Sequence, residues 1–195
     1  MGTLKRLSMK ALGGSDVLAG SGNGKAALGK MIAALPRSAS PILVVVDFDD
    51  VSVATGSFLR EAVVAFRDYC RTNQPSLYPV VANASDETRE DLDLLLKDRG
   101  EVCVVCQVDP RDRISHPQIV GALEEKQIVT LNAVAERGSA DANELHRSAK
   151  ASEGISITGW NNRLASLVLK GVLMEFKQGK SKTYKPVLEG LRYGN

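Results

Sequence analysis

Residues 41–48 read PILVVVDF, a continuous apolar and mostly β-branched run between a proline and a pair of acids. Such a run is typical of a β-strand that is buried on both faces of a sheet. Residues 77–82 and 101–108 are two further strand candidates, and apolar residues recur at helical spacing in residues 57–70 and 85–97. Strands that alternate with helices predict an α/β fold, in which helices cover a sheet on at least one face.

Composition narrows the class of protein. The chain has 195 residues, of which 44% are hydrophobic and 25% charged, and these values are ordinary for a soluble globular protein. The longest apolar run, Ile42–Val46, is far shorter than the ~18 residues of a membrane helix, and no apolar segment follows the basic start as in a secretory signal. Three cysteines cannot build a disulfide framework. We therefore expect a cytoplasmic protein with no membrane partner.

The charge is distributed unevenly along the chain. Residues 1–110 hold 12 lysines and arginines against 14 acids, whereas residues 111–195 hold 13 against 9. This asymmetry predicts that the second half meets a polyanion, although a solvated lysine-rich surface would have the same composition. Two prolines, Pro110 and Pro117, enclose a short polar stretch. We place the domains at residues 1–110 and 114–195 and expect them to touch, because the linker is short.

Two motif-like features of the first half indicate structure more than chemistry. Residues 20–26 (GSGNGKA) resemble a phosphate-binding loop, but Ala19 and Ala26 stand where that loop needs a glycine and a hydroxyl, so a turn that starts a helix is the better interpretation. Cys103 and Cys106 have a metal-site spacing, yet on a strand they point to opposite faces. We expect buried structural cysteines, no metal and no cofactor.

The histidines, His116 and His146, belong to no recognisable catalytic motif, and the sequence offers no nucleophile paired with a base. We therefore expect that the protein is not an enzyme.

The strand–loop–helix segment at residues 46–59 carries a resemblance. It resembles the STAS fold family, and is closest to the STAS-like relatives found beside histidine-kinase-type ATPases; the likeness covers roughly residues 20–108. The family places a phosphorylatable serine at a helix N-terminus, which implies phosphorylation of Ser57 or Thr55. The family's Asp-Ser-Ser/Thr-Gly run is absent, since this chain has Ala54-Thr55-Gly56-Ser57. Capping of the helix by Ser57 is the alternative interpretation.

The second half shows the element order of a winged helix-turn-helix. Apolar spacing predicts helices at residues 117–137, 141–150 and 155–173, and a hairpin with a basic turn follows at residues 174–187. Residues 155–187 resemble the recognition helix and wing of MarR- or ArsR-like bacterial regulators. The likeness rests on Leu164-Ala165-Ser166-Leu167, Gly171 and Tyr184-Lys185-Pro186-Val187, and it implies binding to double-stranded DNA as a homodimer.

A helical wheel separates packing from recognition in the third helix. One stripe, which includes Trp160 and Leu164, is apolar, so we expect Trp160 in the core. The other side carries amides, hydroxyls and a guanidinium, which are groups that read base edges. The wing lysines suit phosphates. The candidate DNA-binding residues are Ser156, Thr158, Asn161, Asn162, Arg163 and Ser166 on the helix, and Lys177, Gln178, Lys180, Ser181, Lys182 and Lys185 on the wing.

These observations predict a DNA-binding transcriptional regulator of bacterial type. The winged helix-turn-helix would read duplex DNA, and the STAS-like α/β domain would sense a signal, dock a regulatory protein partner or dimerise. The alternative is a partner-switching adaptor, similar to antagonists of anti-sigma factors, in which both domains bind proteins.

Overall fold

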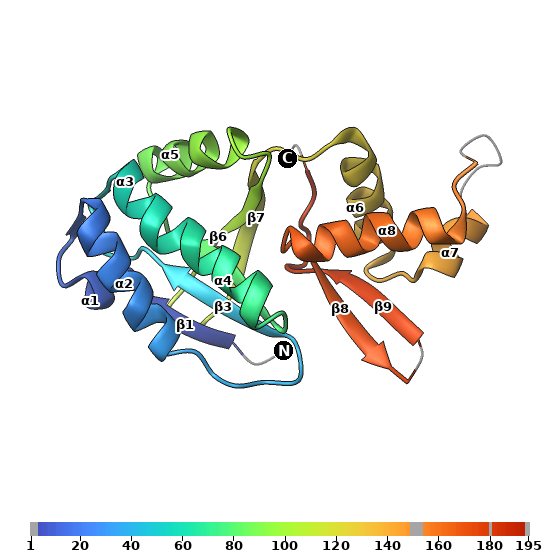
Figure 1. Ribbon diagram of the computed structural model, residues 1–195, viewed down its shortest axis with the longest axis horizontal. Helices are drawn as coiled ribbons and strands as arrows, with labels where there is room; N and C mark the ends of the chain where they lie inside the picture. Colours follow the sequence, from blue (N-terminus) through green and yellow to red (C-terminus); the bar gives the residue numbers. More distant parts are fainter. Residues whose placement is uncertain (1–3, 149–153, 180, 194–195) are drawn as a thin grey trace.

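The computed structural model describes residues 4–148, 154–179 and 181–193, and its centre is a five-stranded sheet (Figure 1). The strands lie in the order β1-β3-β5-β6-β7; the first four are parallel and β7 is antiparallel to β6. Their bounds are β1 (Leu4–Ser8), β3 (Ile42–Asp47), β5 (Leu77–Ala82), β6 (Val102–Val108) and β7 (Ile114–Gly121). The predicted α/β class is confirmed, and the structure adds that the sheet is mainly parallel.

The helices of residues 4–108 pack against one face of this sheet. The parallel strands follow each other across the sheet in one direction, so right-handed crossovers return on the same side every time. The helices are α1 (Met9–Gly13), α2 (Ser21–Ala33), α3 (Gly56–Leu59), the π-helical segment η1 (Arg60–Val64), α4 (Ala65–Asn73) and α5 (Asp86–Lys97). Phe58, Phe66 and Leu92 from these helices share a core with Val44 and Val46.

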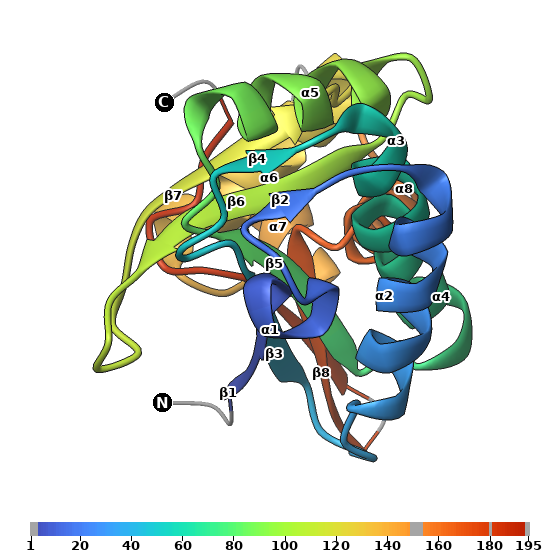
Figure 2. The same cartoon turned by 90° about the vertical axis from the view of Figure 1, so that its left-hand side faces the viewer.

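Two very short strands, β2 (Val17–Leu18) and β4 (Val53–Ala54), pair in parallel outside the main sheet (Figure 2). They join the loop before α2 to the loop before α3.

The opposite face of the sheet is covered by the C-terminal elements. These are α6 (Glu125–Arg137), α7 (Ala142–Ser148), α8 (Ile157–Leu169) and the antiparallel hairpin of β8 (Leu173–Gln178) and β9 (Ser181–Pro186). Val45, Tyr78 and Val104 of the sheet belong to the same buried cluster as Leu167 and Leu173. The end of α8 and the start of β8 therefore pack on the face that the first set of helices leaves open, while α7 lies away from the sheet (Figure 1).

The structure corrects the predicted start of the second half. Residues 114–121 form β7 and not the start of a helix, and α6 begins at Glu125. Pro117 lies where the register between β6 and β7 shifts, in an edge strand, so its missing N–H costs no ladder bond. The sheet thus continues beyond residue 110, where we placed the end of the first domain.

Smaller differences concern helix ends. Ser57 does not cap α3: the N-cap is Thr55, and Ser57 lies inside the first turn. α8 ends at Leu169 and not at residue 173, and Gly171 follows with a φ of 75°. Ser85, Gly138 and Ser156 bound their helices as their residue types predict. Residues 149–153, at the predicted end of the second helix and in the turn after it, lie outside the described residues.

Candidate nucleic-acid interface

Helix α8 presents amides and a hydroxyl to solvent. Its buried side contains Trp160, which is 2% exposed, and Leu164. Thr158, Asn161 and Asn162 lie on the other side and are exposed. No acid occurs between Ile157 and Leu169. The exposed stripe therefore offers hydrogen-bond donors and acceptors without a negative charge that would repel a nucleic acid.

Three other predicted residues of this helix are held by contacts within the protein. The Ser166 hydroxyl accepts a hydrogen bond from Gln127 Nε2 at 2.9 Å. The Arg163 guanidinium lies 5.5 Å from the centre of the Trp160 ring. The Ser156 hydroxyl accepts from the Gly159 N–H at 3.1 Å and caps the helix. Ser156 remains exposed, whereas Arg163 and Ser166 are half-buried, and each of the three already makes a contact within the protein.

The C-terminal end of α8 is fastened to the α/β half of the chain. Lys170 Nζ donates to the Gly100 carbonyl at 2.6 Å, and Arg71 Nη1 donates to the Val168 carbonyl at 3.4 Å. From this anchor the helix extends away from the sheet (Figure 1). The exposed residues of its first turns lie at the free end.

One face of the β8–β9 hairpin carries a small ion-pair cluster. Lys177 and Lys182 stand opposite each other, and Glu175 lies 3.3 Å from the first ammonium and 3.0 Å from the second. Burial raises the pKa of Glu175, but the bonds and charges of the two lysines outweigh this effect and leave the pKa below its ordinary value. Burial and the Glu175 charge raise the pKa of Tyr184 to about 12. The carboxylate offsets half of the lysine charge on this face.

The other face and the tip complete the hairpin. Lys185 Nζ lies 5.5 Å from the centre of the Phe176 ring. Gln178 and Ser181 are exposed at the strand ends next to the turn. Lys180, the remaining predicted wing residue, lies outside the described residues.

Thr55 and Ser57, predicted as phosphorylation sites, lie together and are half-buried. Their hydroxyl oxygens are 3.2 Å apart, and Thr55 Oγ1 also accepts from the Gly20 N–H at 3.3 Å. Residues 20–26 start α2 here, as the sequence predicts, and the helix begins at Ser21.

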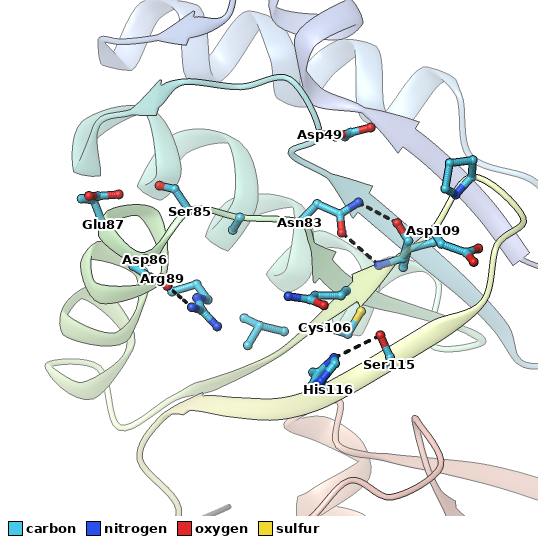
Figure 3. Close-up of a pocket in the computed structure, with 15 residues that line it drawn as sticks. Asp49, Asn83, Ser85, Asp86, Glu87, Arg89, Cys106, Asp109, Ser115 and His116 are labelled. Atoms are coloured by element: carbon cyan, nitrogen blue, oxygen red, sulfur yellow. Dashed lines mark hydrogen bonds and ion pairs between the residues drawn. The ribbon is translucent and has the colours of Figure 1, made fainter.

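A cleft of about 780 Å³, which no local sequence pattern predicts, opens at the carboxyl ends of β5 and β6 (Figure 3). Asn83, Cys106 and Asp109 line it from the strand ends, and His116 lines it from β7. His116 has a φ of 51°, and its Nδ1 lies 3.2 Å from the Ser115 hydroxyl.

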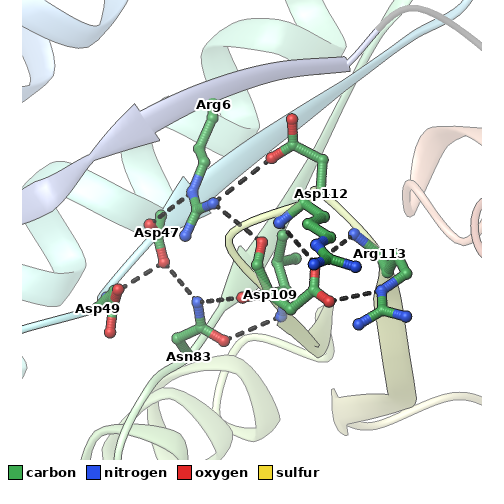
Figure 4. Close-up of polar contacts among 9 residues, drawn as sticks. Arg6, Asp47, Asp49, Asn83, Asp109, Asp112 and Arg113 are labelled. Atoms are coloured by element: carbon green, nitrogen blue, oxygen red, sulfur yellow. Dashed lines mark hydrogen bonds and ion pairs between the residues drawn. The ribbon is translucent and has the colours of Figure 1, made fainter.

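A polar network closes the same edge of the sheet (Figure 4). Asp47 is 3% exposed, and it accepts hydrogen bonds from Arg6 Nε and Asn83 Nδ2, each at 2.8 Å. The bond to Asp47 raises the pKa of Arg6. Asn83 also exchanges two hydrogen bonds with the backbone of Val108. These hydrogen bonds join β1, β3, β5 and β6. In the sequence, the feature that indicates this network is Asp47, an acid at the end of the buried strand β3.

The three cysteines of the chain are buried. Cys103 and Cys106 belong to the cores on opposite faces, as their strand spacing predicts, and Cys70 is also buried. Within residues 4–148, 154–179 and 181–193 no three histidines, cysteines or acids are grouped to hold a metal ion. In the same part of the chain, no helix has the length and apolar character needed to cross a membrane.

Comparison of the chain with known protein families and with curated proteins returns no match.

Proposed function

We propose that the C-terminal elements form a winged helix-turn-helix that binds duplex DNA and that the protein is a transcriptional regulator. α7 and α8 would be the helix-turn-helix, with α8 in the major groove, and the β8–β9 hairpin would be the wing. The observation that supports this most is the exposed, acid-free stripe of Thr158, Asn161 and Asn162, beside a hairpin with exposed lysines.

The chemistry of these groups suits two tasks. An asparagine amide can pair with both hydrogen-bonding positions of adenine, and a threonine can contact the thymine methyl group. Asn161 and Asn162 would therefore read bases. Lys177, Lys182 and Lys185 would contact phosphates and supply affinity that depends on salt.

The α/β half would sense a signal, dock a partner or dimerise. A regulator of this kind binds two half-sites of DNA as a dimer. A molar mass of two chains per particle in solution, measured by light scattering with and without duplex DNA, would support this part of the proposal. A monomer on a single half-site would contradict it.

Fluorescence anisotropy with labelled duplexes tests DNA binding. The slope of log affinity against log salt should be steep, and Lys177→Ala with Lys182→Ala should flatten it by about 2, because each phosphate contact contributes roughly one. Lys25→Ala, which removes an exposed lysine from α2, is the matched control and should leave the slope unchanged. Affinity that is insensitive to salt, or equally reduced by the control, would contradict the proposal.

Base reading has its own test. In a selection from random duplexes, Asn162→Ala should lose preference at one base position, whereas Asn143→Ala, an exposed amide on α7, should not. An unchanged selected sequence for Asn162→Ala would remove this residue from the reading surface.

A partner-switching adaptor is the second candidate, and one surface favours it. Val17 and Val53 pair on β2 and β4, and each is 49% exposed. Val53 lies two residues before Thr55, whose hydroxyl accepts a hydrogen bond from the Gly20 N–H just after β2. Phosphorylation of Thr55 or Ser57 would place a charge beside this apolar pair. If duplex DNA does not bind, and if Val53→Asp abolishes capture of a kinase-like or sigma-like protein, the adaptor is the better description.

A further inference from the structure

A cationic cavity lies where α4, the α5–β6 loop and the end of α8 meet. Its volume is about 420 Å³. Its lining includes four cations and two carboxylates: Arg67, Arg71, Arg99 and Lys170, with Asp68 and Glu101. The cavity therefore carries an excess of positive charge.

The two carboxylates are already shared among three of the cations. Asp68 lies 2.8 Å from Arg67 and 2.9 Å from Arg99. Glu101 pairs with Arg67 and lies 3.8 Å from Lys170. Among the described residues, no carboxylate pairs with the remaining cation, Arg71.

Arg71 is short of acceptors as well as of a counter-ion. Its Nη1 has one long bond, to the Val168 carbonyl, and its guanidinium carbon lies 4.3 Å from the centre of the Tyr78 ring. Its Nε and Nη2 atoms are buried and have no hydrogen-bond partner within the described chain. The Nε of Arg67 is likewise buried without a hydrogen-bond partner among the described residues, and the Arg67 side chain is 7% exposed. Burial lowers the pKa of Arg71, as expected for a charge without a counter-ion.

We infer that this cavity binds a small dianion of the phosphate class, with Arg71 as its main ligand and Arg99 and Lys170 beside it. Two negative charges would balance the cavity, and the fork of N–H groups on a guanidinium matches phosphate oxygens. A turn of the Arg71 side chain would direct its unfilled donors to the anion. Because Arg67 is almost fully buried here, the ligand must be small enough to enter, such as inorganic phosphate or a phosphate monoester.

The position of the cavity gives the ligand a structural role. Arg67 and Arg71 come from α4, whereas Lys170 follows α8 directly. A bound dianion would tie the α/β half to the end of the helix whose first turns are exposed. This inference does not depend on DNA binding, so each can fail while the other holds.

Isothermal titration calorimetry of the full chain with inorganic phosphate, in the absence of DNA, tests the site. We expect saturable binding of one phosphate per chain, and no such binding of chloride at equal ionic strength. Arg71→Gln should weaken binding by roughly tenfold or more, since hydrogen bonds to charged groups are among the stronger ones. Arg137→Gln, on the exposed end of α6, is the control and should bind as the wild type does.

A second variant protects the test against misfolding. Lys170→Gln removes a cation at the rim and should also weaken phosphate binding severalfold, whether or not Arg71→Gln folds. The absence of saturable binding, or equal affinity in all variants, would overturn the inference. It would also be overturned if phosphate did not bind while Arg71→Gln lowered duplex DNA affinity, because the phosphate would then belong to the DNA backbone.

Discussion

Replacing Tyr78 with phenylalanine tests whether the sheet supports the C-terminal elements. Tyr78 lies on β5, is 2% exposed and belongs to the core that both halves share. Its hydroxyl oxygen accepts a hydrogen bond from the Glu175 N–H of β8 at 3.2 Å, and Arg71 stacks over its ring. Tyr78 thus contacts both the β8–β9 hairpin and Arg71, which donates a hydrogen bond to the end of α8.

The expected magnitude follows from these contacts. Tyr78→Phe keeps the ring and leaves the Glu175 N–H without its acceptor, which should cost about 1–2 kcal/mol of unfolding free energy. Tyr78→Ala also removes the buried ring, so its loss should reach about 4–5 kcal/mol. With a slope of roughly 2 kcal/mol per molar urea, the midpoints should fall by about 0.5–1 M and about 2 M.

Urea unfolding followed by tryptophan fluorescence is the assay. Trp160 is the single tryptophan of the chain and lies in α8, so its signal reports the C-terminal half, whereas Tyr78 lies in the sheet. Circular dichroism should show the same midpoint. Tyr69→Phe, on α4 at the other face of the sheet, is the control and should change stability by less than about 0.5 kcal/mol. If the Trp160 transition stays in place in both Tyr78 variants, the shared core does not couple the two halves.

Four further outcomes are expected. Glu175→Gln should raise affinity for duplex DNA by about two- to fivefold in anisotropy titrations, because it frees the two hairpin lysines; weaker binding would contradict this. The pKa of Glu175 is lowered in the folded protein, so the ionised carboxylate should stabilise the fold at pH 7. This contribution to the free energy of unfolding should disappear as the pH falls below about 4. Unfolding curves of Glu175→Gln and of the wild type, measured at both pH values, check it. Gly121→Ala should lower the free energy of unfolding in urea by about 2–4 kcal/mol, because Gly121 has a φ of 94° and an added Cβ would lie 2.1 Å from the Glu101 carbonyl oxygen. Gly138→Ala is the control, since Gly138 has a φ of 71° but open space around it, and its loss of stability should be smaller. An equal loss in both variants would refute the steric reason. Burial raises the pKa of the thiols of Cys70 and Cys106 to about 12 and that of Cys103 to about 11. The cysteines should therefore react with a thiol reagent at pH 8 only after denaturation. Prompt labelling of the folded chain would contradict this.

Local sequence was sufficient wherever a single element decided the outcome. The run at residues 41–48 predicts a buried strand and forms β3, and Ser156 predicts the start of α8. Trp160 was expected in the core from the helical wheel and is buried there. Periodicity and caps carry this information because they depend on neighbours within a few residues.

Local sequence does not predict how distant segments pair. Residues 114–121 contain a proline, a histidine and polar residues, and their pattern does not separate a strand edge from a helix start; pairing with β6 decides that they form β7. Likewise, the lysines of the hairpin suggest free charge, but only the register of β8 and β9 shows that Glu175 lies between them.

The sequence by itself determined the buried strands β3, β5 and β6 and the approximate extents of helices such as α5 and α8, because each follows from a local pattern of apolar and polar residues. The tertiary structure alone decided which surfaces remain free. The one-directional strand order leaves one face of the sheet to the C-terminal elements. The packing of α8 against α6 and α7 leaves Asn161 and Asn162 exposed, and the hydrogen bond from Arg71 to the Val168 carbonyl joins α4 to the end of α8. These outcomes depend on contacts between residues far apart in the chain, and no local pattern records such contacts.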